Sequence, residues 1–272
     1  MNNKAERITI AQRLSSERIM TYPLKKVTLK ADVYMVCLEH ALSTENFEVM
    51  GLLIGDNVEG VTSISAMKIS SRSDKKKDRV EISPSESVKA WEEAERLTKE
   101  LHKTMRVIGW YHSHPHITIC PSQIDINTQQ LYQTMERSFV GLIFSVFSED
   151  QTTKEQEVML TCFQSCHGSS KEIPLEIIYT PNVSIWCCRS MIELPQILVQ
   201  EEKNVAENYK NHPDILVHIC NNAVYIQALC HITDMVTKPL VHALTERLIS
   251  NKKSSVFLQE QIDDLKKLLI NP

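Results

Sequence analysis

The apolar positions of this chain change their period several times, and each change marks a predicted element. An extended apolar start near Val27 precedes residues 32–43, in which apolar side chains recur at helical spacing. Residues 48–56 and 61–70 have the composition of strands, and the polar stretch between them predicts a hairpin turn at 57–60. This part of the chain is therefore predicted to contain a strand, a helix and a β-hairpin.

A helix is predicted from Pro84 to about His102. Proline suits the first position of a helix, because the N–H that it lacks would have no helical partner there. The apolar positions of this helix form a stripe, which we expect to pack on the sheet: Val88, Trp91, Ala94 and Leu97.

Beyond this helix the sequence predicts one further helix, at residues 122–138. It also predicts four strands: 105–114, 139–147, 157–164 and 175–181. Strands and helices are mixed here, whereas a doubly wound parallel sheet needs a crossover helix after each strand. This order predicts an α+β fold with a mixed β-sheet flanked by helices. We place this domain at residues 25–183, after an N-terminal extension of residues 1–24.

Residues 184–272 differ from the rest, because their apolar positions recur at helical or heptad intervals almost throughout. We predict a helical region here, either a coiled coil or a helical bundle, which Pro239 should kink or divide. Such apolar stripes pack either back onto the first domain or against another chain, and the sequence favours neither.

Composition and charge narrow the class of protein. With 272 residues, 42% of them hydrophobic and 24% charged, the chain is predicted to be an ordinary folded, soluble protein. Its longest uninterrupted apolar stretches fall short of the roughly 20 residues that cross a bilayer, and its polar start lacks the apolar block of a signal peptide. A net charge of −4 argues against nucleic acid or a membrane surface as the main partner.

The eight cysteines are interpreted as reduced thiols, because no export signal places them in an oxidising compartment. We therefore expect the protein in the cytoplasm and nucleus. Cys162, Cys166 and His167 could contribute to a structural zinc site, but their spacing offers no clear fourth ligand. Cys120 has no paired base visible in the sequence, so a thiol protease is a poor alternative.

The informative chemistry lies in the segment that contains His112 and His114. Alternate residues of a strand face the same way, so the two imidazoles can point at one place. Asp125, on the first turn of the following helix, would complete a set of three ligands. Three protein ligands and an open fourth position are typical of a catalytic zinc, whereas structural zinc sites are closed by four ligands.

The full spacing, which also includes Ser122, is specific. It is expected by chance about once in a thousand chains of this composition. Its weakest part is Ser122 followed three residues later by Asp125, a pattern that also marks a helix N-cap. Both interpretations can hold, because a fixed helix end would aim Asp125. His116 also lies two residues from a ligand, but Pro115 interrupts the strand geometry, and we leave it out.

Together with Glu48 upstream, these residues resemble the motif of the JAMM, or MPN-type, metalloproteases, which remove ubiquitin and ubiquitin-like proteins. Here the motif is Glu48 followed by the sequences HSHP at 112–115 and SQID at 122–125. The resemblance covers Val27 to Pro181 and implies an MPN domain with one Zn²⁺ held by His112, His114 and Asp125. It also implies that Glu48 acts as general base and then general acid, and that Ser122 stabilises the oxyanion.

Three segments, 41–55, 109–129 and 139–147, resemble more closely the lysine-63-selective members of this family, which work in the BRISC and BRCA complexes. This resemblance implies a deubiquitinase with lysine-63-linked polyubiquitin as its substrate and a connection to DNA repair. It also implies a catalytically inactive MPN partner of the Abraxas type and further subunits. The helical region at 184–272 would provide apolar faces for that partner.

Other functions stay open at this point. The chain could be another MPN isopeptidase, a deneddylase or a broad-linkage deubiquitinase, or a scaffold whose metal site is structural. The polar runs at 72–79 and 149–155 are either simple loops or, as in related MPN enzymes, insertions that contact the proximal ubiquitin and orient the chain.

Overall fold

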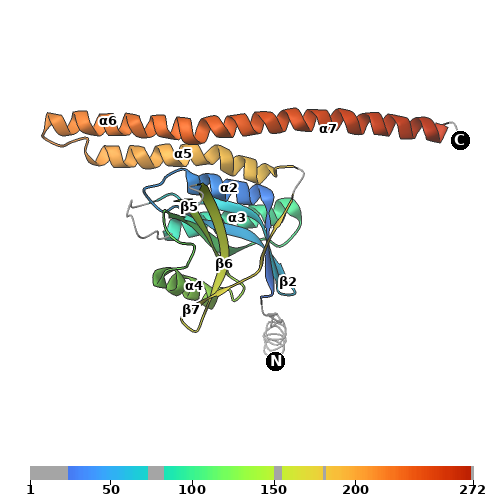
Figure 1. Cartoon of the computed structure of the whole chain (residues 1–272), viewed down its shortest axis with the longest axis horizontal. Helices are drawn as coiled ribbons and strands as arrows, with labels where there is room; N and C mark the ends of the chain where they lie inside the picture. The colour runs from blue at the N-terminus through green and yellow to red at the C-terminus, as the bar shows by residue number, and fades with distance from the viewer. Residues whose placement is uncertain (1–23, 73–82, 150–154, 180–181, 271–272) are drawn as a thin grey trace, which may run out of the picture. The chain divides into compact units, whose positions relative to one another are not determined.

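The computed structural model describes residues 24–72, 83–149, 155–179 and 182–270 (Figure 1). Most of the predicted N-terminal extension, residues 1–23, lies outside the described residues, as do the central parts of the two polar runs. The chain divides into a compact unit 1, up to Ser190, and a compact unit 2, from Met191 onward.

The described part of unit 1 contains an eight-stranded sheet with the order β7-β6-β5-β4-β2-β3-β1-β8. The strands are β1 (Lys26–Lys30), β2 (Met50–Val58), β3 (Val61–Ile69), β4 (Arg106–Pro115), β5 (Val140–Glu149), β6 (Gln156–Cys166), β7 (Ser169–Glu172) and β8 (Leu175–Ile178). The pairs β1–β3, β1–β8 and β4–β5 are parallel, and the other neighbours are antiparallel. The predicted mixed sheet is thus confirmed. The exposed β7 was missed, because its sequence, SSKE, has no apolar position.

The hairpin between β2 and β3 turns where the sequence predicts it. Glu59 and Gly60 both have positive φ, 51° and 86°. Two such residues in a row match the twist of a tight two-residue hairpin. Glu48, which was predicted to begin the strand, lies two residues before β2.

Three helices of the described part of unit 1 pack on this sheet: α2 (Ala31–Leu42), α3 (Pro84–Leu101) and α4 (Gln123–Met135). Helix α3 begins at Pro84 as predicted, and the Ser83 hydroxyl caps it by accepting a hydrogen bond from the Glu86 N–H at 3.3 Å.

The predicted apolar stripe of α3 is wrong at its start, since Val88 and Trp91 are 46% and 53% exposed. The buried line is Ala90, Ala94 and Leu97. Each step of three residues turns about 60° short of a full circle, so a stripe built only of such steps drifts around the helix. Its first two members therefore leave the face that packs on the sheet.

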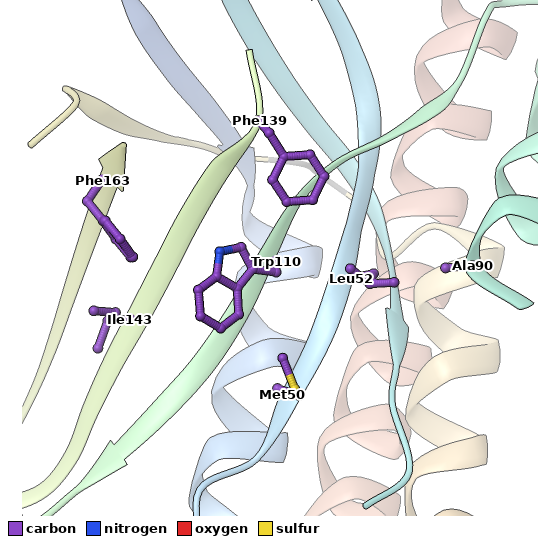
Figure 2. Close-up of a cluster of buried hydrophobic side chains, with 7 residues drawn as sticks. All are labelled: Met50, Leu52, Ala90, Trp110, Phe139, Ile143 and Phe163. Atoms are coloured by element: carbon purple, nitrogen blue, oxygen red, sulfur yellow. The ribbon is translucent and has the colours of Figure 1, made fainter. Parts of the chain in front are cut away.

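The alternation along β4 sends its side chains to two different environments. Tyr111 meets α2 through a hydrogen bond to His40. Trp110, on the other face, belongs to an apolar cluster with Ala90 of α3 (Figure 2). The rest of that cluster comes from β2, β5, β6 and the loop before β5: Met50, Leu52, Phe139, Ile143 and Phe163.

Helix α5 (Ile185–Asn208) begins in unit 1, where the Trp186 indole N–H donates to the Ser65 carbonyl at 3.0 Å. Unit 2 continues with α6 (Ile215–Ile232), a π-helical turn η1 (Thr233–Thr237) and α7 (Lys238–Ile270). The helical character of this region is confirmed.

Pro239, which was predicted to kink or divide this region, does not end the helix, which runs on through this residue with a change from α-helix to π-helix just before it. The turn η1 directly precedes it, and the Lys238 N–H reaches back five residues to the Thr233 carbonyl. A π-type turn inserts an extra residue and so accommodates a proline that an uninterrupted α-helix would exclude.

The helix Ile215–Leu269 exposes many apolar side chains. An 18-residue window in it has a mean hydropathy of 1.4, and 6% of that window is buried. By length and composition alone, this helix could cross a membrane, although no single uninterrupted apolar run in the sequence is long enough. Its exposed apolar residues include Ile215, Leu216, Ile219, Val224 and Ile226.

Candidate metal centre

His112 and His114 lie on one face of β4 and are almost completely buried, with 1% and 3% exposure. Their Nε2 atoms are 3.0 Å apart. Strand β4 pairs with β5 at both histidines and with β2 as far as His112, so neighbouring strands hold the backbone that carries the imidazoles. The predicted convergence of the two side chains is therefore present.

Asp125 reaches the same place from the first turn of α4. Its carboxylate accepts a hydrogen bond from the Ser122 N–H at 2.7 Å, and its N–H donates to the Ser122 hydroxyl at 3.2 Å. This reciprocal capping box fixes the start of α4. Asp125 Oδ1 lies 3.4 Å from His112 Nε2, and Oδ2 lies 3.6 Å from His114 Nε2. The cap and the ligand interpretations of this motif are thus compatible.

The three donor atoms lie within 4.8 Å of one another, and no other such group of three occurs in the described part of the chain. Two ligand atoms, each about 2.05 Å from a tetrahedral ion, are about 3.3 Å apart. The observed separations of 3.0, 3.4 and 3.6 Å surround this value. Two imidazoles and one carboxylate therefore fit a metal ion of the transition series.

The two imidazole rings are oriented by different contacts. His114 Nδ1 lies 2.7 Å from the Thr118 carbonyl, to which it can only donate. When the His114 ring is neutral, its Nε2 atom, which faces the centre, therefore carries no proton and can bind a metal ion. His112 Nδ1 has no hydrogen-bond partner among the described residues. Its ring instead stacks on the Trp110 indole, with the centroids 4.5 Å apart and the planes 12° apart.

The electrostatics of the centre favour a cation. Burial raises the pKa of Asp125, but the hydrogen bonds from His112 and His114 outweigh burial and hold this pKa well below its usual range. Burial lowers the pKa of His112 more than Asp125 raises it. Burial also lowers the pKa of His114, but Asp125, the Thr118 carbonyl and the charge of Glu48 together raise it above its ordinary value. A carboxylate thus stays ionised beside buried imidazoles.

The centre opens into a cavity of about 690 Å³. Its walls include Glu48, Phe47 and Ser122 as well as the three ligands. Glu48 is half-buried and lines the cavity, and its negative charge raises the pKa of His114. The predicted catalytic residues therefore face the same cavity as the predicted metal ligands.

Other candidates from the sequence lie apart from the metal group. His116 adopts a φ of 59° directly after β4 and lies 3.6 Å from Glu45, with its side chain 55% exposed. Cys120 is exposed on the cavity wall. Cys162 is buried in β6, whereas Cys166 is exposed at the end of that strand, so they do not form a second group of metal ligands.

Sequence reasoning missed residues that support the ligands. Trp110 lies two residues before His112 on the same face of β4, and Gln129 lies one helical turn after Asp125. Strand and helix periodicity could have placed both near the site. No local signal indicates that the Trp110 indole N–H donates to Gln129 Oε1, at 2.8 Å, because this contact depends on how α4 packs.

Comparisons with known proteins agree with this architecture. The family model "JAB1/Mov34/MPN/PAD-1 ubiquitin protease" matches residues 23–138. The family model "BRCC36 C-terminal helical domain" matches residues 187–265.

Full-length relatives match most of the chain. The protein named Lys-63-specific deubiquitinase BRCC36 from Camponotus floridanus is 60% identical over 245 residues, which cover 90% of this chain and 97% of that protein. The protein of the same name from Xenopus tropicalis is 41% identical over 251 residues, or 89% of this chain and 96% of that protein. The one from Rattus norvegicus is 42% identical over 275 residues, or 89% and 94%. The chain therefore belongs to the BRCC36 family of JAB/MPN-domain proteins.

Proposed function

We propose that this protein is a zinc-dependent isopeptidase that cleaves lysine-63-linked ubiquitin chains. The observation that carries the proposal is the convergence of His112, His114 and Asp125 in a cavity that Glu48 also lines. The lysine-63 preference is supported by the relatives, which are named Lys-63-specific deubiquitinases. Zinc is supported by the donor atoms, because two imidazole nitrogens and one carboxylate oxygen suit zinc, whereas calcium and magnesium prefer ligands that are all oxygen.

The chemistry follows from the donor set and its surroundings. Zinc bound by three protein ligands lowers the pKa of a bound water to about 7 and polarises a carbonyl. Glu48 would accept the proton of the attacking water and deliver it to the lysine amine that leaves. Ser122, at the N-terminus of α4, would hold the developing oxyanion where the helix dipole favours negative charge.

The first test replaces the proposed proton carrier. Glu48→Gln should retain zinc and abolish cleavage of lysine-63-linked diubiquitin, because an amide cannot accept the proton. The matched control is Glu92→Gln, the same substitution at an exposed position of α3. Cleavage by the Glu48→Gln variant at the rate of the control would contradict the proposal.

Substrate choice is tested by measuring cleavage of diubiquitins with different linkages and of a conjugated ubiquitin-like protein. We expect product from lysine-63-linked diubiquitin and little from other linkages or from a conjugated ubiquitin-like protein. Equal cleavage of several linkages would indicate a broad-linkage enzyme. Cleavage of only the ubiquitin-like conjugate would indicate a deneddylase. If no substrate is cleaved although zinc is bound, a scaffold is indicated.

The proposal includes an inactive MPN partner of the Abraxas type. It is supported by the exposed apolar side chains of α6 and by the BRCC36-type helical domain to which this region belongs. Ile219, 59% exposed, tests this role. Ile219→Asp should weaken partner binding and reduce cleavage, whereas Asn222→Asp, an equal change of charge at an exposed polar position of the same helix, should leave both unchanged. Unchanged binding in both variants would argue against this surface.

We also propose that the protein works in the cytoplasm and nucleus. All eight cysteines, which lie in the described part of the chain, are free, and thiols persist in these reducing compartments. Imaging of the tagged protein in cells should show both locations. Accumulation in the secretory pathway would contradict this placement.

A further inference from the structure

The two histidines of the centre differ in what fixes their rings. A metal-bound histidine usually donates its second N–H to a carbonyl, carboxylate or water, which fixes the ring and tunes its basicity. His114 follows this rule through the Thr118 carbonyl. His112 has no such partner among the described residues, and a stacked Trp110 takes the place of the hydrogen bond. The orientation of His112 therefore depends on what holds Trp110.

Trp110 is 2% exposed and is held at its one polar atom. The indole N–H donates to Gln129 Oε1 at 2.8 Å. Gly141, beside Trp110 on β5, leaves room for the ring, since a Cβ there would lie 3.0 Å from the indole nitrogen and 2.5 Å from the Phe163 ring. Figure 2 shows the indole lying among Phe139, Ile143 and Phe163. Packing thus surrounds the ring, and one hydrogen bond defines its rotation.

Gln129 is itself completely buried and fully engaged. Its Nε2 atom donates to the Phe139 carbonyl at 2.7 Å and to Gln133 Oε1 at 2.9 Å. With the bond from Trp110, both ends of the amide are satisfied, so its orientation is fixed. Gln129 also lies four residues after Asp125 on α4, on the same face of the helix.

We propose that Gln129 is a positioning residue that couples two ligands of the metal centre, Asp125 through α4 and His112 through Trp110. One side chain then sets the distance between the helix that carries the carboxylate and the strand that carries the imidazole. This inference rests on the metal centre of the proposed function. Substitution of Gln129 should weaken zinc binding, because residues that support metal ligands contribute about 10-fold to 100-fold to the affinity for the metal.

The test measures zinc affinity of the full chain by competition with a chelator. Gln129→Met keeps the length of the side chain and removes its hydrogen bonds, and it should weaken zinc binding by about 10-fold or more. The control for mere destabilisation is Leu97→Ala, a fully buried residue of a different apolar cluster. It should lower the melting temperature without changing zinc affinity.

A double-mutant cycle tests whether the effect passes through the indole. Trp110→Phe keeps an aromatic ring beside His112 and removes the N–H. If the proposal holds, Gln129→Met has little further effect on zinc affinity in the Trp110→Phe background. Additive losses would overturn the coupling, and so would zinc affinity within about twofold of wild type for Gln129→Met. Failure of the wild-type chain to bind zinc would instead refute the metal centre itself.

Discussion

Ser113 and Val49 exchange two hydrogen bonds between β4 and the residues just before β2. The Val49 N–H donates to the Ser113 hydroxyl at 2.9 Å, and the Ser113 N–H donates to the Val49 carbonyl at 2.9 Å. Ser113 is completely buried and lies between the two histidine ligands, whereas Val49 directly follows Glu48. The pair therefore ties the proposed proton carrier to the strand that carries two of the proposed metal ligands.

Ser113→Ala should lower kcat while zinc stays bound. The substitution leaves the buried Val49 N–H without its acceptor, at a cost of about 1–3 kcal/mol, and loosens the backbone at Glu48. A displaced catalytic group reduces the rate by roughly 10-fold to 100-fold. Steady-state kinetics on diubiquitin and zinc affinity measured by competition would separate the two effects. Ser113→Thr, which retains the hydroxyl, should keep most of the activity. Equal loss of zinc binding and rate in Ser113→Ala would contradict this role.

Removal of the metal should stop cleavage and lower stability. A ligand that binds only the folded state at a thousandfold excess over its Kd stabilises it by about 4 kcal/mol. We expect the melting temperature to fall after chelation and to rise again with added zinc. Asp125→Ala should abolish this zinc-dependent shift. Asp56→Asn, which alters a carboxylate paired with Lys103 instead, should retain it. A shift of equal size in both variants would contradict the site.

His40 should make the stability of the fold depend on pH. Its Nδ1 atom lies 2.9 Å from the Tyr111 hydroxyl. Burial, and then the positive charge of Arg72, lowers the pKa of His40 from 6.5 to about 3. The unfolded chain therefore binds a proton here that the folded chain excludes. This contribution to stability is complete above pH 6.5 and is lost as the pH falls towards 3, by about 1.4 kcal/mol per pH unit.

The measurement compares wild type with His40→Gln by urea unfolding. The variant loses the titrating group, so the gap between the two free energies of unfolding should narrow by about 2 kcal/mol from about pH 7 to about pH 5. Contributions from other titrating groups are common to both proteins and cancel. Parallel pH profiles would show that His40 does not titrate as expected.

Gly51→Ala should destabilise the sheet behind the metal centre. A Cβ at this position would lie 2.5 Å from both the Lys68 carbonyl oxygen and the Tyr111 ring, so the strands must shift. Such overpacking costs about 1–3 kcal/mol. Chemical denaturation would measure this loss, with Gly168→Ala as control, since a Cβ there meets nothing within 4 Å. The control carries a φ of 77° and should show only the smaller cost of its backbone conformation. A Gly51→Ala variant as stable as wild type would contradict the close packing.

The sequence by itself determined the order of most elements and the three donors of the metal group. Both depend on short separations along the chain. Strand alternation brings His112 and His114 to one face, and the capping motif at Ser122 places Asp125 on the first turn of α4. Local backbone geometry encodes such relationships, so they can be predicted without knowledge of the remaining fold.

Only the tertiary structure decided the relationships between distant segments. Val27 of β1 pairs with Leu175 of β8, and Glu48 faces a cavity shared with ligands more than sixty residues later. The bond from Trp110 to Gln129 likewise depends on the packing of α4. Long-range pairings follow from the combined burial of many side chains. The local spacing of apolar residues does not indicate which distant segments pair. The same limit explains α3, where the sheet selected Ala90 rather than Val88 for the buried face.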